Sequence, residues 1–452
     1  MKQEVNQEIA KKQKALKVSI HEGAASSLSL SIGETYITPF ALALKAQPFH
    51  IGIINSFSGL ISPLAQFFGS KILEKYTRKK IVLFSALIQS LLWIPIVLLA
   101  FAFWKGMFQE NAIYFLLIFY SLLSALGGLL YPAWFSWMGD LVPEKERGKY
   151  FGNRTRILSA VGLIGVLIGA FVLDAFKTRG LLLFGFASLF LAASLFRFVS
   201  YIILHKQYSP QFKLKKKYYF SLLDFLKRFD NFGKFAVYQA LFNFVLMIAS
   251  PFFAVYMLQE LNFNYITFMI VTISSTIFYL LFVPLIGKFS DKYGNRLLLH
   301  TGAFLFSINP ILWIFIKSPL LLILIPQMIV GLANAALVIG HINFTYGSVS
   351  KEHRAICTAY ANILIGIGVF FGSLLGGLII NYAHPSFINT FVFVFLISAI
   401  GRFAVSFIFL KILKDEKKFP SLPPQHIHLF HPFKTIHSEI GWVKHVMFSN
   451  GK

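Results

Sequence analysis

The sequence contains few charged residues and almost no cysteine. Charged residues make up 13% of its 452 positions, against about 25% in an average soluble protein. A soluble domain with so few charges could not cover its apolar surface with polar groups. The one cysteine, Cys357, excludes an intrachain disulfide and a cysteine-built metal site. A phosphate-binding loop of the Walker type and a nucleophile elbow are also missing, which argues against an ATP-driven pump.

Apolar residues are abundant instead. They make up 56% of the chain, and phenylalanine alone supplies 52 residues. This content excludes disorder for most of the chain. A helix needs about 20 apolar residues to cross the hydrocarbon of a membrane, so the chain is long enough for about twelve crossings. We therefore expect an all-α polytopic membrane protein, without a cofactor or a metal site.

The apolar runs between clusters of charge predict twelve membrane-spanning helices. They cover approximately residues 18–44, 49–70, 81–104, 112–139, 155–176, 180–204, 234–259, 263–287, 296–316, 319–346, 355–380 and 388–413.

The formal net charge of +24 would suggest nucleic-acid binding in a soluble protein. Here most lysines and arginines lie in the termini and in every second loop between spans. This is the pattern expected when basic residues stay on the cytoplasmic side of the membrane. The basic residues expected in the opposite connections are Lys45, Lys105, Lys177, Arg179 and Lys317. This distribution predicts an even number of spans and both termini in the cytoplasm. We expect a multi-pass protein of the plasma membrane. Residues 1–17 run directly into the first span and are interpreted as part of a retained signal-anchor.

Five regions follow from this pattern. They are a cytoplasmic N-terminal segment (1–17), a first six-helix bundle (18–204), a central cytoplasmic loop (205–233), a second six-helix bundle (234–414) and a basic C-terminal tail (415–452). The central loop contains SLLDFLKRF at 221–229, which is typical of a short amphipathic helix at the interface, or else of a solvated linker. The histidines of the tail are interpreted as solvated, with metal binding as the less favoured alternative.

The two halves of the chain repeat one another. Four pairs match in the same order at nearly the same spacing: Glu74 with Asp291 (217 positions), Arg147 with Arg354 (207), Arg197 with Arg402 (205), and Thr38-Pro39-Phe40 with Ser250-Pro251-Phe252 (212). We infer a duplication. Because each unit has six spans, an even number, the repeats are parallel and the bundles are pseudo-symmetric.

Two loops of the repeats resemble the signatures of the major facilitator superfamily. GKFSDKYGNR, from Gly287, is similar to the family's G-x-x-x-D-[RK]-x-G-x-[RK] motif, and PEKERGKYFG, from Pro143, is similar to its P-E-x-x-R-G-x-x-x-G motif. The copy of the first motif that begins at Ser70 is degraded. The resemblance covers approximately residues 18–414. It implies gating or signature residues at Glu74, Arg78, Glu144, Arg147, Gly148, Gly287, Asp291, Lys292, Gly294, Arg296 and Arg354. These loops either latch the halves and regulate opening, or only fix topology and packing.

Polar residues inside the spans form stripes at helical spacing, which is costly in hydrocarbon unless they face the protein interior. In the first span, Gly23, Ser27, Ser31, Glu34 and Thr38 are three or four positions apart. Similar stripes occur in the fourth, seventh and tenth spans, and the resemblance implies that these four helices line a central cavity. The candidate substrate or ion pathway comprises Ser27, Ser31, Glu34, Thr38, Tyr131, Trp134, Gln239, Asn243, Asn334 and His341.

Glu34 is interpreted as the single acid deep inside a span. It either carries a coupled proton or pairs with a basic residue such as Arg154, Arg156 or Arg197. His341 is a proton partner or a packing histidine. Arg197 and Arg402 occupy equivalent places, where pairing between helices or extension of the side chain to the interface is favoured.

The resemblance implies a secondary transporter that moves a small organic solute by alternating access, coupled to protons or another ion. We expect a monomer in the lipid bilayer, without enzymatic activity and without nucleic acid. The fourth span lacks arginine and the fifth lacks the proline of the family's antiporter motif, which lowers the case for drug export. Two alternatives are a non-transporting scaffold, assembly factor or receptor on the same fold, and an enzyme acting on lipid.

Overall fold

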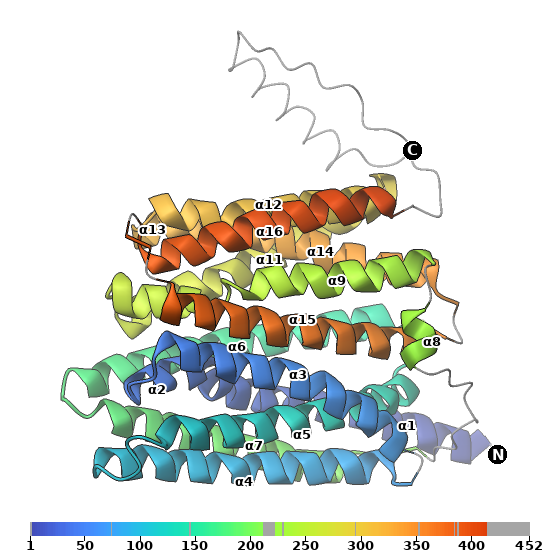
Figure 1. Ribbon diagram of the computed structural model, residues 1–452. Helices are drawn as coiled ribbons and strands as arrows, with labels where there is room; N and C mark the ends of the chain where they lie inside the picture. The colour runs from blue at the N-terminus through green and yellow to red at the C-terminus, as the bar shows by residue number, and fades with distance from the viewer. Residues whose placement is uncertain are drawn as a thin grey trace. The chain divides into compact units, whose positions relative to one another are not determined.

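The computed structural model describes residues 2–73, 75–143, 146–210, 222–227, 230–293, 295–350, 353–383, 385–386 and 388–413. Helices dominate, and the described residues contain no strand (Figure 1). In the part of the chain that the structure describes, eleven helices are long and apolar enough to cross a membrane. The first expected span, residues 18–44, is not one of these eleven helices. It corresponds to the second half of the long polar helix at the start of the chain and to the two short helical segments that follow that helix. The expected all-α polytopic fold is confirmed.

The helices of the first repeat follow the predicted spans closely. They are α1 (Lys2–Ile32), the 3₁₀ segment η1 (Glu34–Tyr36), α2 (Ile37–Ala43), α3 (Pro48–Ile72), α4 (Arg78–Trp104), α5 (Ala112–Leu141), α6 (Arg147–Lys177) and α7 (Leu182–Lys206). A short helix, α8 (Leu222–Leu226), follows in the central loop, within the segment predicted to form one.

The helices of the second repeat have the same order. They are α9 (Asn231–Met247), α10 (Phe252–Val255), the π segment η3 (Tyr256–Glu260), α11 (Tyr265–Tyr293), α12 (Asn295–Phe315), α13 (Pro319–Leu322), the π segment η4 (Ile323–Gln327), α14 (Met328–Ser348), α15 (Arg354–Tyr382) and α16 (Thr390–Ile412).

The first span of each repeat is interrupted at an equivalent place. The helix α1 ends at Ile32 and α2 begins at Ile37, whereas α9 ends at Met247 and α10 begins at Phe252. Both pairs of positions are 215 apart, close to the spacing of the sequence repeat. In the second repeat Pro251 contributes to the break, because proline has no N–H to donate to the preceding turn. The interruption therefore belongs to the repeated fold.

The described residues belong to two compact units. Unit 1 contains residues within 1–222, 239–270 and 359–397, and unit 2 contains residues within 223–238, 271–358 and 398–452. In unit 1, a side chain at Gly128 of α5 would collide with the Ser62 carbonyl of α3. Glycine at this position therefore permits the close approach of the two helices.

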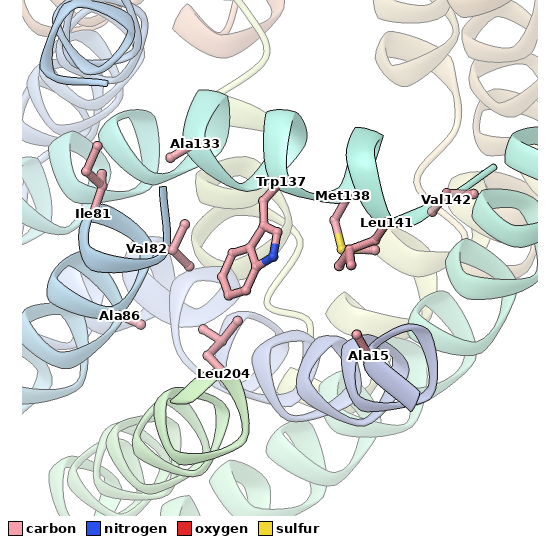
Figure 2. Close-up of a cluster of buried hydrophobic side chains, with 10 residues drawn as sticks. All are labelled: Ala15, Ile81, Val82, Ala86, Ala133, Trp137, Met138, Leu141, Val142 and Leu204. Carbon is pink, nitrogen blue, oxygen red and sulfur yellow. The ribbon is translucent and has the colours of Figure 1, made fainter. Parts of the chain in front are cut away.

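A buried apolar cluster in unit 1 joins α1, α4, α5 and α7 near the predicted cytoplasmic ends of these helices. Figure 2 shows Trp137 of α5 directed toward Val82 and Leu204. The Trp137 indole Nε1–H donates to the Tyr208 carbonyl at 3.0 Å, so the chain that leaves α7 is attached to this cluster. The remaining members are Ala15, Ile81, Ala86, Ala133, Met138, Leu141 and Val142. The cluster therefore packs the ends of these four helices together.

Candidate functional site

Unit 1 contains a cavity of about 360 Å³ lined by polar and apolar residues from five spans of the first repeat. This volume lies at the lower end of the range for small-molecule sites, about 300–1,000 Å³. Its lining combines one carboxylate, one guanidinium, one carboxamide, several hydroxyls and one indole. The lining residues are Ser26, Ser29, Leu30, Glu34, Ser58, Gly59, Ser62, Gln89, Trp93, Tyr120, Leu123, Ser124, Gly127, Leu130 and Arg197.

Glu34 reaches this cavity because the first span is interrupted beside it. The α-helix ends at Ile32, and Glu34 begins the 3₁₀ segment η1. Gly33, at the break, leaves room for the Trp93 ring, since a Cβ there would lie 2.6 Å from it. The Glu34 side chain is partly buried. Among the described residues it has no hydrogen bond and no ion pair within 4 Å. It interacts electrostatically with Arg197, which lines the same cavity.

Arg197 of α7 is held in place by uncharged acceptors. Its guanidinium donates from Nε and Nη2 to the Gln89 carboxamide oxygen, at 2.9 and 2.7 Å. Nη1 donates to the hydroxyls of Ser26 and Ser200, both at 3.0 Å. The residue is 8% exposed. Arg197 therefore pairs with groups on neighbouring helices, which is one of the two interpretations made from the sequence.

Glu22 is a second buried carboxylate of the first span, and the sequence analysis missed it. The residue is 4% exposed, and its Oε1 accepts from the Ser200 hydroxyl at 3.0 Å. Arg154 of α6 lies 3.5 Å and Arg197 lies 4.0 Å from its carboxylate. The prediction that Glu34 is the single deep acid of the span was therefore wrong. A signal was available, since Glu22 lies four positions before Ser26 and therefore on the same helical face as that serine.

Two predicted pathway serines of α1 contact α6 instead of lining the cavity. Ser27 donates to the Leu158 carbonyl at 2.7 Å. Ser31 donates to the Leu28 carbonyl at 3.0 Å, and its hydroxyl fills the space beside Gly165. Thr38 lies beyond the break, half-buried in α2. The first span thus has two polar faces, one toward the cavity and one toward α6.

The two predicted pathway residues of the fourth span, Tyr131 and Trp134, lie in different surroundings. Tyr131 is 52% exposed and stacks on Phe135, with ring centroids 6.0 Å apart. Trp134 lies beneath the Arg154 guanidinium, 4.6 Å from the ring centroid. The cavity is lined instead by Tyr120 and Ser124 of the same helix.

The predicted residues of the second repeat fall in both units. In unit 1, Gln239 is buried and its carbonyl accepts from the Asn243 amide at 2.9 Å. In unit 2, Asn334 is half-buried in α14. On the same helix, the buried Nε2 atom of His341 has no hydrogen-bond partner among the described residues. Its ring lies edge-on to Phe235 at 5.5 Å.

The signature loops make the same contact in both repeats. Arg147 Nη2 donates to the Gly139 carbonyl at 2.9 Å, and Arg354 Nη2 donates to the Tyr346 carbonyl at 3.1 Å. Each carbonyl lies eight positions before its arginine, near the end of the preceding span. Cations are favourable at this end of a helix. The duplication inferred from sequence thus has an equivalent hydrogen bond in each copy.

Other signature residues have separate contacts. Arg78 pairs with Asp140 at 2.6 Å, and Arg296 donates to the Lys411 carbonyl at 3.4 Å. Gly287 lies within α11. Glu74, Glu144 and Gly294 lie outside the described residues, as do the side chains of Asp291 and Lys292 and the surroundings of Gly148.

Arg402 repeats the position of Arg197 but not its surroundings. It is 1% exposed in α16, donating to the Ser398 hydroxyl at 3.0 Å and to the Phe306 carbonyl of α12 at 2.8 Å. Each arginine therefore joins the sixth span of its repeat to the third.

Unit 1 also contains contacts between the two repeats. Asp174, near the end of α6, accepts the backbone N–H groups of Tyr265 and Ile266 at 3.0 and 2.9 Å. The Ser56 hydroxyl of α3 donates to the Phe370 carbonyl of α15 at 2.8 Å. These contacts join the fifth span to the eighth and the second to the eleventh. Within the described ranges, no group of three or more His, Cys, Asp or Glu side chains could hold a metal ion.

A helical membrane protein with duplicated six-span halves and a cavity among its spans has the architecture of a secondary transporter. The chain belongs to the Major Facilitator Superfamily, whose family model matches residues 24–229 and 235–443. Its family and fold are those of multi-pass membrane transporters.

Individual relatives are distant. A Schizosaccharomyces pombe protein described as an uncharacterized transporter is 26% identical over 98 residues, which is 22% of this chain and 17% of that protein. The chain thus matches only a small part of this relative's length. Among solved structures, a variant of the nucleoside transporter NupG has 16% identity and a TM-score of 0.67, covering 88% of this chain and 100% of that one. An auto-inhibited POT family peptide transporter has 10% identity and a TM-score of 0.70, covering 91% and 99%. These likenesses concern the fold alone.

Proposed function

We propose that this transporter moves a small organic solute and couples its movement to protons through Glu34. The observation that carries the proposal is the position of Glu34 at the wall of the cavity, where its side chain has no direct hydrogen bond or ion pair among the described residues. A carboxylate in such a place is costly unless it is neutralised. Binding a proton neutralises it, and release of that proton on the other side of the membrane couples transport to a pH gradient.

The other cavity groups suit a polar solute. Tyr120, Ser58, Ser62 and Ser124 offer hydroxyls, and Trp93 contributes part of an aromatic ring to the lining. Such a combination binds polar compounds that have one apolar surface. The remaining predicted pathway residues, including Gln239, Asn243, Asn334 and His341, are proposed to join the pathway at other stages of the cycle.

Alternating access requires contacts between the repeats that form and break. The cap that Asp174 provides for α11 and the Ser56 hydrogen bond to α15 are contacts of this kind. We assign them to the gate on the side opposite the cytoplasm, because the distribution of lysine and arginine predicts that both termini are cytoplasmic. The signature arginines Arg147 and Arg354 are proposed to stabilise the cytoplasmic helix ends of a monomer in the plasma membrane.

Purified protein in liposomes tests the coupling directly. Solutes that stabilise the protein are identified first, from a panel that includes nucleosides and short peptides because transporters of similar fold carry these compounds. Flux is then measured with and without a pH gradient. We expect uphill transport in the wild-type protein and none in Glu34→Gln.

A matched control is Glu110→Gln, which removes an exposed acid between α4 and α5. This variant should transport normally. Uphill transport that is unchanged in Glu34→Gln would show that another group carries the proton. A complete lack of solute flux in the wild-type protein would contradict the proposed activity itself.

A further inference from the structure

Glu22 and Glu34 interact with the same arginine from two sides. They are twelve positions apart in the first span, about 18 Å of helical rise, with Glu22 in α1 and Glu34 in η1. The Glu22 carboxylate is 4.0 Å from Arg197 Nη1. Arg197 in turn lines the cavity with Glu34 and interacts electrostatically with both carboxylates.

Few other ionisable groups face these two acids. Arg154 and Tyr150, both on α6, interact with Glu22. Tyr120 of α5 interacts with Glu34. From α3 and α4 the cavity receives only uncharged groups. The charge that Glu34 experiences is therefore set mainly by Arg197, and Glu22 offsets the charge of that arginine.

We propose that Glu22 is a positioning residue that sets the proton affinity of Glu34 through their shared partner, Arg197. The inference rests on the proposed role of Glu34 as the proton-binding group. Glu22 itself does not contact the cavity. It acts by orienting Arg197, together with Ser200, and by cancelling part of its positive charge.

The sign of the effect follows from Coulomb's law. Removing the negative charge of Glu22 leaves Arg197 less compensated, which favours the ionised form of Glu34. The pH at which Glu34 is half-protonated should then fall, by about half to one pH unit for charges at this separation in a protein interior. Removing the positive charge of Arg154 should have the opposite effect.

Infrared spectroscopy of the purified protein in liposomes measures this midpoint without a known solute. The carboxyl band of Glu34 is identified by subtracting the spectrum of Glu34→Gln and is followed from about pH 4 to about pH 9. We expect the midpoint to move to lower pH in Glu22→Gln and to higher pH in Arg154→Gln. Glu22→Asp, which keeps the charge, should titrate close to the wild-type protein.

The outcomes separate this inference from the function on which it rests. If no band lost in Glu34→Gln titrates in the wild-type protein, Glu34 is not the proton site and both proposals fail. If the band titrates but its midpoint is the same in Glu22→Gln and Arg154→Gln, only the present inference is overturned. Shifts of both variants in the same direction would also overturn it, because they would indicate a structural disturbance. If Glu22→Gln does not fold, the upward shift in Arg154→Gln still decides the question.

Discussion

Asp174 at the end of α6 caps α11 by accepting the backbone N–H of Tyr265 at 3.0 Å and that of the following residue at 2.9 Å. The first N–H groups of a helix have no partner within the helix. Here the fifth span of one repeat supplies the acceptor for the eighth span of the other. The cap therefore stabilises one arrangement of the repeats.

Loss of this cap should weaken the structure measurably. Asp174→Ala is expected to lower the free energy of unfolding by about 1 kcal/mol, the usual cost of removing a helix cap. Asp174→Asn should cost less, because its amide oxygen still accepts one of the two N–H groups. Denaturant unfolding in detergent measures both, with Glu110→Gln as the control. Equal stability of all four proteins would show that water replaces the cap at no cost.

The contact between α3 and α15 should tolerate no added side chain. A Cβ at Gly52 would lie 2.7 Å from the Ser373 carbonyl and 3.2 Å from Gly377. Gly52→Ala is therefore expected to hinder this contact and to reduce transport several-fold. In the control Gly139→Ala, the added methyl group meets nothing within 4 Å, so it should leave transport unchanged. Solute flux in liposomes distinguishes the two. Normal flux in Gly52→Ala would mean that the two helices need not approach so closely.

The equivalent arginines of the two repeats should differ in function. Arg402→Gln removes hydrogen bonds to Ser398 and Phe306 and is expected to cost about 2 kcal/mol of stability, as for other buried charged hydrogen bonds. It should leave the pH dependence of transport unchanged. Arg197→Gln should alter that dependence as well, because Arg197 interacts with Glu34. Parallel measurements of unfolding and of pH–flux profiles test this contrast, which an equal change in both pH profiles would contradict.

The hydroxyl of Tyr120 should contribute to solute binding more than to stability. It interacts with Ser58 and Ser124, which also line the cavity. Tyr120→Phe keeps the ring and is expected to change the free energy of unfolding by less than about 1 kcal/mol. Affinity for the solute found in the stabilisation screen should fall several-fold. A matched substitution outside the cavity, Tyr114→Phe, should leave the affinity unchanged. Equal affinities in the two variants would remove Tyr120 from the binding surface.

The sequence was sufficient to predict the helices and their duplication, because long apolar runs and paired motifs report directly on membrane spans. It did not resolve which polar face of the first span borders the cavity. Ser26 and Ser27 are adjacent, so their side chains point about 100° apart around the helix. Both faces carry serines at helical spacing. Only the packing of α6 against Ser27 and Ser31 separates them.

The missed role of Glu22 has a similar physical reason. An acid near the start of a span can reach the headgroup region, so its position alone does not indicate burial. Its burial depends on Arg154 and Arg197, which are more than 130 positions away in sequence. Such long-range pairing is not visible in local spacing.

The interruptions of the first and seventh spans indicate where bending of these helices costs least. Around Gly33 and around Ser250 the regular α-helical hydrogen bonding is broken, so a change of direction there disrupts fewer bonds than it would within an intact helix. Arg147 and Arg354, by contrast, tie the end of one span to the start of the next. If helix ends held in this way move as rigid bodies, the first and seventh spans bend at their interruptions. Glu34 lies at the first of these, so its protonation and the bend angle of the helix would change together.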